Sequence, residues 1–305
     1  MAKLRGPHLS TPLTLLGSDR DALLRGDETI LEPGEDVRYL VSRAGAVSLR
    51  EDEDGTLHAS LETEDPRGGT RQPLVLLGRR EGYRVLGVEV PEPSPELDDP
   101  GRDLRDLRRI ADRLHERDAD LAAAAVAMGF WHRSMRHCPQ CGAVLEAEMA
   151  GWVLRCPEDG TEQFPRTDPA VIMAVRDAQD RLLLARNAHF PTGFHSVLAG
   201  FVEPGESLEN AVVREVGEEV GVIVEEVEYM GSQPWPFPRS LMLGYRAWAA
   251  GSAELTLQDE EIAEARWFTR EELAAALEAD EIQLPGSASM GRALIDDWYG
   301  RSAQK

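Results

Sequence analysis

The segment Gly200 to Val222, which reads GFVEPGESLENAVVREVGEEVGV, limits what this chain can fold into more than any other. Residues three and four apart on a helix share one face, so this spacing gathers Glu215, Glu218 and Glu219 on a predicted helix. Each pair of like charges at such spacing destabilises a helix by roughly 0.2 to 0.5 kcal/mol. A divalent cation would remove that cost, because Mg²⁺ takes oxygen ligands and commonly joins carboxylates to substrate phosphates.

The same helix carries an apolar stripe beside its acids. Val212, Val216 and Val220 lie four residues apart, which predicts that one helix face packs on a sheet while the adjacent edge presents carboxylates. In a chain this acidic, a solvated acidic helix face is the alternative interpretation. The spacing of the whole segment is more specific than its charge, and it favours a metal site that handles phosphates.

The segment matches every specified position of a known motif, the Nudix box. Those positions are Gly200, Glu206, Arg214, Glu215, Val216, Glu218, Glu219, Gly221 and Val222. The chain therefore resembles the Nudix hydrolases. This resemblance implies hydrolysis of a nucleoside diphosphate linked to another moiety, with Mg²⁺ or Mn²⁺ held by a loop, a helix and a second loop.

Composition limits the partners. The chain has 305 residues, which suits two domains, and its 33 Lys and Arg against 55 Asp and Glu give a net charge of −22. Such a charge disfavours a general binder of nucleic acids or anionic membranes, whose affinity comes from cationic contacts. The sequence has no apolar run of membrane-spanning length and no signal-peptide pattern at its N-terminus. We therefore expect a cytoplasmic protein without membrane contact.

Three cysteines lie close together and predict a metal site. Their odd number and clustering argue against a secreted disulfide framework. Cys138-Pro-Gln-Cys141-Gly forms a knuckle, and Cys156-Pro-Glu-Asp159-Gly repeats its shape with an aspartate in place of a fourth cysteine. We predict structural Zn²⁺ bound by Cys138, Cys141, Cys156 and Asp159. His137 is a competing fourth ligand, and an empty, degenerate ribbon is the other alternative.

The pattern along the chain predicts an α/β protein in three parts. Short strand-like runs between Val37 and Val90, a helix beginning near Asp103 and an alanine-rich helix at 121–128 indicate a small α+β domain over 1–131. The cysteine ribbon occupies 132–167, and 168–305 alternates strands with helices around a mixed sheet. That this last domain is a Nudix α/β/α sandwich is implied by the resemblance. Residues 1–131 contain no catalytic motif, so we expect them to cover the catalytic domain and support a dimer.

A proline-rich string follows the box. It reads Ser232-Gln233-Pro234-Trp235-Pro236-Phe237-Pro238-Arg239-Ser240, in which prolines stiffen the backbone between two aromatic residues and an arginine. Composition alone favours an ordinary turn with inward-packed aromatics, or a polyproline recognition peptide. After a Nudix box, however, SQPWPFP is similar to the signature of the bacterial NAD(H) pyrophosphatases. That family also has a zinc ribbon between an N-terminal domain and the Nudix domain.

The family resemblance implies site residues. It makes Glu215, Glu218, Glu219 and Arg214 the catalytic group. Its Mg²⁺ or Mn²⁺ ligands would be the main-chain carbonyl of Ala199, Glu215, Glu218, Glu219 and Glu261. The substrate loop would comprise Gln233, Pro234, Trp235, Pro236, Phe237, Pro238, Arg239 and Ser240, with Phe164 and Phe201 as stacking partners for the rings of NAD. Arg214 would pair with neighbouring glutamates, and either Glu218 or Glu219 would act as the base.

The expected reaction is attack of water on the pyrophosphate of NADH or NAD⁺, which releases AMP and the nicotinamide mononucleotide. The resemblance also leaves room for NAD-capped RNA ends as substrates and implies a homodimer. A second enzyme hypothesis moves the substrate to ADP-ribose, an ADP-sugar or a diadenosine polyphosphate. A third hypothesis is a non-catalytic nucleotide sensor or a zinc-ribbon interaction module, and the intact set of box carboxylates argues against it.

Overall fold

A computed structural model describes residues 8–14, 17–68, 70, 72–91, 101–251, 254–257 and 261–300. The chain divides into two compact units. The N-terminal unit holds Pro12–Thr167 together with the short segment Pro234–Ser240. The C-terminal unit holds Asp168–Gln233, the chain from Leu241 onward and a short N-terminal segment.

The N-terminal unit is built on a seven-stranded sheet. Its strands are β1 (Val37–Arg43), β2 (Ala46–Glu51), β3 (Leu57–Ala59), β4 (Leu61–Glu62), β5 (Leu74–Arg80), β6 (Tyr83–Glu89) and β7 (Asp103–Asp106). They run in the order β3-β2-β1-β6-β5, with β4 paired to β1 and β7 paired to β2. Strands β1 and β6 are parallel, whereas β5 and β6 are antiparallel. The remaining elements are η1 (Ala22–Leu24), η2 (Glu28–Leu31), α1 (Leu107–Ile110), η3 (Glu116–Asp118) and α2 (Ala119–Ser134).

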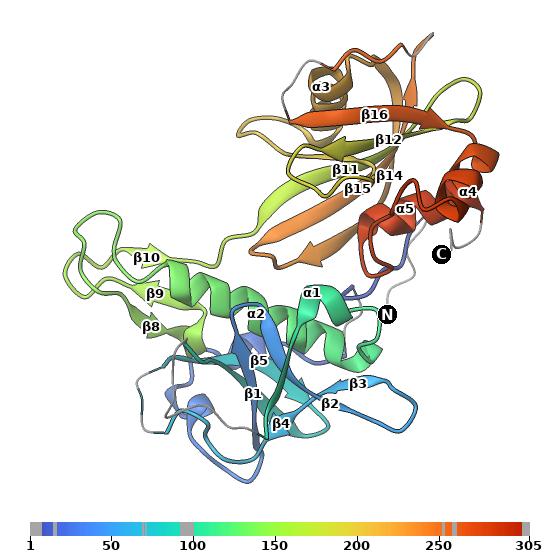
Figure 1. Cartoon of the computed structure of the whole chain (residues 1–305). Helices are drawn as coiled ribbons and strands as arrows, with labels where there is room; N and C mark the ends of the chain where they lie inside the picture. The colour runs from blue at the N-terminus through green and yellow to red at the C-terminus, as the bar shows by residue number, and fades with distance from the viewer. Residues whose placement is uncertain are drawn as a thin grey trace. The chain divides into compact units, whose positions relative to one another are not determined.

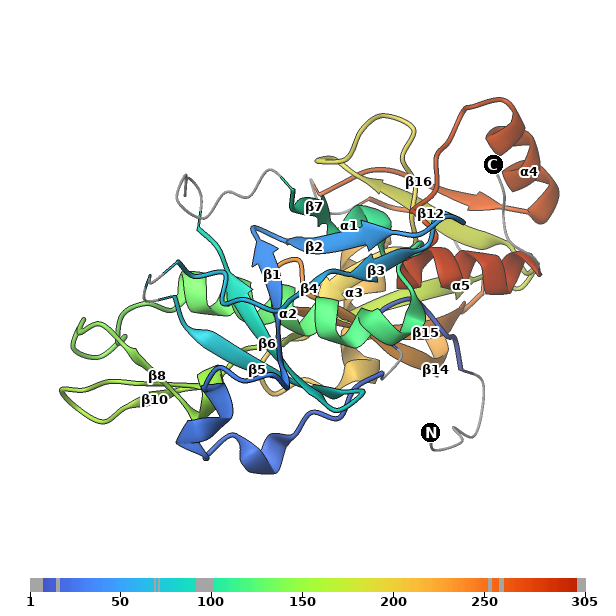
Figure 2. The same ribbon diagram turned by 90° about the horizontal axis from the view of Figure 1, so that it is seen from below.

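Helix α2 lies along this sheet, and Figure 2 shows it beside β5 and β6. Its alanines at 122–125 are buried, and such small side chains let the helix approach the strands closely. The alanine-rich helix predicted at 121–128 is therefore present and extends to Ser134.

The prediction that a helix begins near Asp103 is wrong. Residues 103–106 instead form β7, which pairs antiparallel with β2. The helix begins only at Leu107, because the Asp106 carboxylate accepts the backbone N–H of Arg108 at 2.9 Å and caps it. Leu107 and Ile110 are buried, so the apolar spacing was a correct guide to the core but not to the helix start.

The cysteine ribbon is a three-stranded sheet within the N-terminal unit. Its strands β8 (Glu146–Glu148), β9 (Val153–Arg155) and β10 (Glu162–Gln163) run in the order β10-β9-β8, and η4 (Met149–Gly151) joins the first two.

The C-terminal unit is a sheet covered by helices on both faces. Its strands are β11 (Asp168–Arg176), β12 (Leu182–Asn187), β13 (Leu198–Phe201), β14 (Val224–Trp235), β15 (Ser240–Ala249) and β16 (Ile262–Phe268). The order is β14-β15-β11-β12-β16, with β13 paired to β11. The helices are α3 (Leu208–Val220), α4 (Arg270–Glu278) and α5 (Met290–Tyr299), as Figure 1 shows.

Alternate residues of β11 pack into two separate hydrophobic cores, one on each face of the sheet. Val171, Met173 and Val175 pack with α3, whereas Ile172 and Ala174 pack with α4 and α5. Helix α3 therefore covers one face of the sheet, and α4 and α5 cover the other. The predicted α/β/α sandwich is confirmed.

Two boundaries differ from the sequence expectation. Strand β14 continues to Trp235, so the proline-rich string begins inside a strand and its turn is confined to 236–239. Helix α5 was not predicted, although Ser289 caps it and Leu294, Ile295 and Trp298 bury one face. In the part of the chain that the structure describes, no helix combines the length and apolar character needed to span a membrane.

Candidate active site

The three box glutamates of helix α3 differ in how deeply their side chains are buried. The Ser207 side chain accepts the backbone N–H of Asn210 at its start, and Gly221, at a φ of 70°, ends it. Between these caps Glu219 is buried, Glu215 is half-buried and Glu218 is exposed. A buried carboxylate is costly unless it is paired or binds a metal, so the depth of Glu219 requires a partner for its carboxylate.

Glu215 lies directly against the backbone of β13. A Cβ atom placed on Gly200 would come within 1.9 Å of the Glu215 Cδ atom, so the carboxylate fills the space that the glycine leaves. Ala199, the residue before Gly200, is exposed and pairs with Ile172 of β11. The glycine of the motif thus brings a carboxylate beside the backbone of the sheet.

Arg214 holds the surrounding acids in place. Its Nε donates to Glu206 at 2.8 Å, and its Nη2 donates to the carbonyl oxygen of Phe201 at 3.0 Å. Its Nη1 lies 2.9 Å from Glu215 Oε1 and 3.0 Å from Glu218 Oε2. The guanidinium also lowers the pKa of Glu206 to about 2. Arg214 therefore fixes side-chain positions across the box, as residues that hydrogen-bond to ligands do at metal sites.

The carboxylates are close enough to influence one another. Burial raises the pKa of Glu215 more than its ion pair with Arg214 lowers it, and the charges of Glu218 and Glu261 add to the rise. Glu261 comes from the chain just before β16, where its Oε1 accepts the Asn187 side-chain N–H at 2.7 Å. The charges of Glu218 and Glu261 thus reach Glu215, although the described residues include no group of three box carboxylates whose oxygens all lie within 4.8 Å of one another.

The donor set fits a hard divalent cation. It consists of carboxylate oxygens from a helix and a loop beside exposed backbone, the ligand type that Mg²⁺ and Mn²⁺ prefer. Burial is the main cause of the raised pKa of Glu215, and the charges of Glu218 and Glu261 add to it, so a bound cation would stabilise the ionised carboxylate. Sequence reasoning missed Asn187, which is distant in sequence and is recognised only as a spatial neighbour.

The ribbon residues also converge. Ligand atoms of Cys138, Cys141, Cys156 and Asp159 all lie within 4.8 Å of one another. The Cys141 and Cys156 sulfurs are 3.4 Å apart, and Cys138 Sγ is 3.4 Å from Asp159 Oδ2. Hydrogen bonds from Thr161 hold the pKa of Asp159 below its ordinary value and keep it anionic. Three sulfurs and one oxygen in this cluster suit Zn²⁺, and His137 does not belong to it.

The substrate loop differs from expectation at its first residue. Gln233 is fully buried; its Nε2 donates to the Ala288 carbonyl at 2.7 Å, and its Oε1 accepts the Met290 N–H at 2.7 Å. This side chain therefore ties β14 to the start of α5 and has no exposed surface for a ligand in this conformation. Trp235 and Phe237 contact edge to face at a centroid distance of 5.1 Å.

The two predicted stacking residues are accessible. Phe164 is 58% exposed and Phe201 is 61% exposed, which is high for large aromatic side chains. Pro234 and Pro238 are also exposed, Arg239 and Ser240 are partly buried, and Pro236 is buried. Arg108 lies over the Trp235 ring at 5.9 Å from its centroid.

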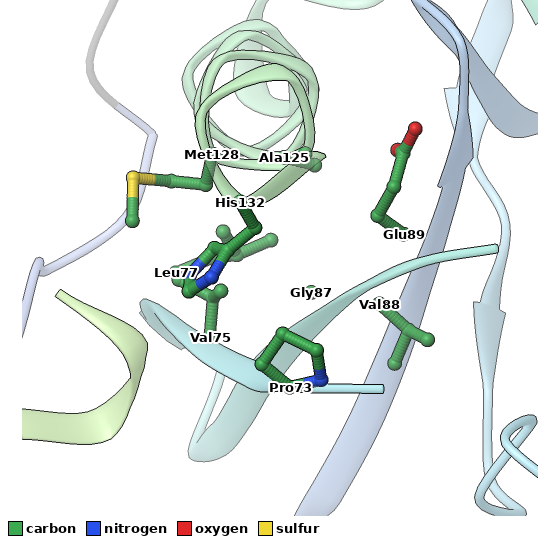
Figure 3. Close-up of a pocket in the computed structure, with 10 residues that line it drawn as sticks. Pro73, Val75, Leu77, Gly87, Val88, Glu89, Ala125, Met128 and His132 are labelled. Carbon is green, nitrogen blue, oxygen red and sulfur yellow. The ribbon is translucent and has the colours of Figure 1, made fainter. Parts of the chain in front are cut away.

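A small cavity beneath α2 can be set aside as a ligand site. Figure 3 shows Met128, Ala125 and His132 of the helix facing strand residues that include Val75 and Leu77. Its volume of about 10 Å³ leaves room for about one water molecule. Burial lowers the pKa of His132, whose Nε2 is bonded to the Gly151 carbonyl at 2.8 Å.

Comparison with protein families identifies three consecutive segments. Residues 166–286 match the NUDIX domain, and residues 133–164 match the NADH pyrophosphatase zinc ribbon domain. Residues 18–131 match an NADH pyrophosphatase-like rudimentary NUDIX domain, a relationship that left no recognisable motif in the sequence. The predicted cofactor classes, a divalent cation for the box and zinc for the ribbon, agree with these matches.

Several curated proteins are similar over most of their length. The chain is 45% identical over 236 residues to the NAD-capped RNA hydrolase NudC of Mycobacterium bovis BCG, covering 73% of this chain and 74% of that protein. It is 44% identical, with the same coverage, to the protein of that name from Mycobacterium tuberculosis. The protein of that name from Pseudomonas aeruginosa is 41% identical over 76% of this chain and 80% of its own.

These matches define an enzyme class, the Nudix hydrolases. Within that class, the chain belongs to the NADH pyrophosphatase family, which includes proteins named NudC. The resemblance inferred from the box and from SQPWPFP is therefore confirmed.

Proposed function

We propose that this protein hydrolyses the pyrophosphate bond of NADH and NAD⁺ to AMP and the nicotinamide mononucleotide, and that it removes NAD caps from RNA 5′ ends. The observation that carries the proposal is the Glu215 carboxylate of α3 packed against Gly200, in a chain that also has the SQPWPFP string. Relatives named NAD-capped RNA hydrolase, at 41 to 45% identity, support the substrate.

Glu215, Glu219, Glu261 and the Ala199 carbonyl would hold Mg²⁺ or Mn²⁺, with Glu218 close to the same ions. Such ions, when bound, lower the pKa of water and offset charge on phosphate oxygens. Arg214 contributes by position, because its bonds to Glu206 and Phe201 fix the direction in which Glu215 and Glu218 point.

A box glutamate orients or deprotonates the attacking water. Glu219 is buried on α3, which favours a precise position, whereas Glu218 is exposed and paired with Arg214. We therefore assign the proton-accepting role to Glu219, at its carboxylate oxygens.

Exposed aromatic faces hold the substrate rings. Phe164 and Phe201 each expose more than half of their surface, and stacking on such faces binds any nucleotide base. In the loop, we assign substrate contact to Trp235, Phe237, Arg239 and Ser240 with the exposed Pro234 and Pro238, and we assign the buried Gln233 the role of anchor.

The remaining assignments complete the proposal. Zn²⁺ in the ribbon has a structural role, and the protein acts as a cytoplasmic homodimer with a catalytic domain that begins near residue 168. The domain limits 1–131, 132–167 and 168–305 are part of this proposal.

One experiment tests substrate, bond and metal together. NADH, NAD⁺, ADP-ribose and NAD-capped RNA are digested at equal concentration with Mg²⁺, Mn²⁺ or chelator, and the products are separated by chromatography. We expect AMP and the mononucleotide from NADH, and no products with chelator. Preferred cleavage of ADP-ribose would instead support the second hypothesis, and absence of hydrolysis of every substrate would support a non-catalytic role.

A further inference from the structure

A hollow of about 340 Å³ in the N-terminal unit has a composition unlike the rest of the chain. We call it the arginine pocket. The residues that matter are Phe130, Trp131 and Arg133 at the end of α2, Arg166 after the ribbon, and Pro238 and Arg239 of the substrate loop.

The arginine pocket gathers positive charge on an acidic protein. Acidic residues outnumber basic ones by 55 to 33 in the sequence, yet three arginines and no carboxylate line this hollow. An acidic protein that binds a phosphate chain needs a local reversal of its field, because cationic contacts supply the affinity.

The Arg133 side chain is held in place by contacts that use only part of its N–H groups. Its guanidinium lies 4.7 Å from the centroid of the Phe130 ring, and its Nη1 donates to Glu89 at 2.8 Å. Glu89 is itself fixed, because it accepts the Ser42 hydroxyl at 2.7 Å and the Ala44 backbone N–H at 3.0 Å. A guanidinium has five N–H groups, so a pre-positioned Arg133 can still donate to a phosphate.

Trp131 completes the wall of the arginine pocket and is only 6% exposed.

We propose that the arginine pocket binds a nucleotide of the RNA chain that follows the NAD cap. The arginines take its phosphates, and the Phe130 side chain contacts its base. Pro238 and Arg239 belong to both the pocket and the proposed substrate loop, so one segment would contact both the cap and the chain. The inference rests on the proposed function and adds how capped RNA is distinguished from free NADH.

The test compares two substrates in three variants of the full-length protein. Arg166→Ala and Phe130→Ala alter the pocket, and Arg109→Ala, whose side chain is 86% exposed on α1, removes the same charge elsewhere. The measurement is kcat/KM for NADH and for a short NAD-capped RNA, each at several salt concentrations.

We expect Arg166→Ala and Phe130→Ala to lower kcat/KM for the capped RNA at least fivefold while NADH hydrolysis stays within twofold. Arg166→Ala should also make the slope of log kcat/KM against log salt shallower by roughly 0.7, the value for one lost phosphate contact on a single strand. Arg109→Ala should leave both substrates and the slope unchanged.

Equal losses on both substrates, or no loss on either, would overturn the pocket proposal while wild-type activity still supports the proposed function. Wild-type protein that hydrolyses NADH but not capped RNA would overturn the pocket proposal and the cap-removal part of the function. Wild-type protein that hydrolyses neither substrate would overturn the proposed function itself.

Discussion

Glu215 and Gly200 occupy one space: the carboxylate of the helix residue lies where the strand residue would carry a side chain. A Cβ at position 200 would lie 2.1 Å from Oε1 of Glu215, too close for any real contact. The two residues are fifteen positions apart, yet each determines what the other can be.

Gly200→Ala should therefore displace the Glu215 carboxylate and lower turnover of NADH at least about tenfold. The metal concentration needed for half-maximal activity should rise, because a displaced ligand binds its ion less well, by 10-fold to 100-fold in comparable cases. Titration of activity with Mn²⁺ measures both effects. Unchanged activity would show that the approach of Glu215 to β13 is dispensable.

Glu219→Gln should lower kcat at least about a hundredfold with the fold intact, since it removes a metal ligand or the base. Steady-state kinetics with NADH measure the loss, and circular dichroism checks the fold. Glu225→Gln, on the exposed surface of β14, is the matched control and should keep wild-type activity. Near-normal turnover by Glu219→Gln would refute the assignment.

The ion pair between Glu206 and Arg214 predicts that the stability of the protein depends on pH. Its pKa is lowered from 4.5 to about 2 by Arg214, so its stabilising effect is present above pH 4.5 and is lost as the pH falls towards 2. Glu206→Gln should reduce stability at neutral pH and make its decline between these pH values less steep. Chemical unfolding of metal-free protein across this range provides the measurement. Parallel stability curves for the two proteins would contradict it.

The ribbon predicts a matched set of zinc variants. Cys138→Ser should release Zn²⁺ and lower the melting temperature, because zinc-binding energy contributes to folding. Asp159→Cys should hold Zn²⁺ more tightly against a chelator, and His137→Ala should leave zinc content unchanged. Loss of zinc in His137→Ala with full retention in Asp159→Ala would identify the histidine as the ligand instead.

Two helix glycines should respond in opposite directions to alanine. At Gly129 of α2 a Cβ would lie 2.4 Å from Glu89 Oε2, so Gly129→Ala should destabilise the protein by about 1 to 3 kcal/mol. At Gly217 of α3 a Cβ would meet nothing within 4 Å, so Gly217→Ala should stabilise it by about 0.5 to 1 kcal/mol. Urea unfolding measures both, and changes of the same sign would contradict the packing argument.

Local signals explain what the sequence could predict. The box helix has its own cap, period and terminating glycine, so α3 and its acidic face followed from sequence. Helix α5 also carries local signals, in Ser289 and the spacing of Leu294, Ile295 and Trp298, and could have been found.

Long-range contacts account for the rest. Strand β7 exists because β2 supplies a pairing edge, which the spacing of Leu104 and Leu107 does not reveal. Gln233 is an anchor because Ala288 and Met290 lie beside it, and its position in the SQPWPFP string predicted ligand contact instead. The contact between Asn187 and Glu261 is likewise invisible until the strands assemble.

Arg214 gives the protein a resident positive charge among the acids of α3. If Glu215 is a metal ligand, an incoming ion must compete with the guanidinium for a carboxylate oxygen that it already holds at 2.9 Å. The guanidinium therefore keeps the acids in position before a metal binds, and half-maximal activity should need a higher ion concentration than an unpaired carboxylate would require. In a cell, this would make cleavage of the dinucleotide responsive to the supply of free divalent metal.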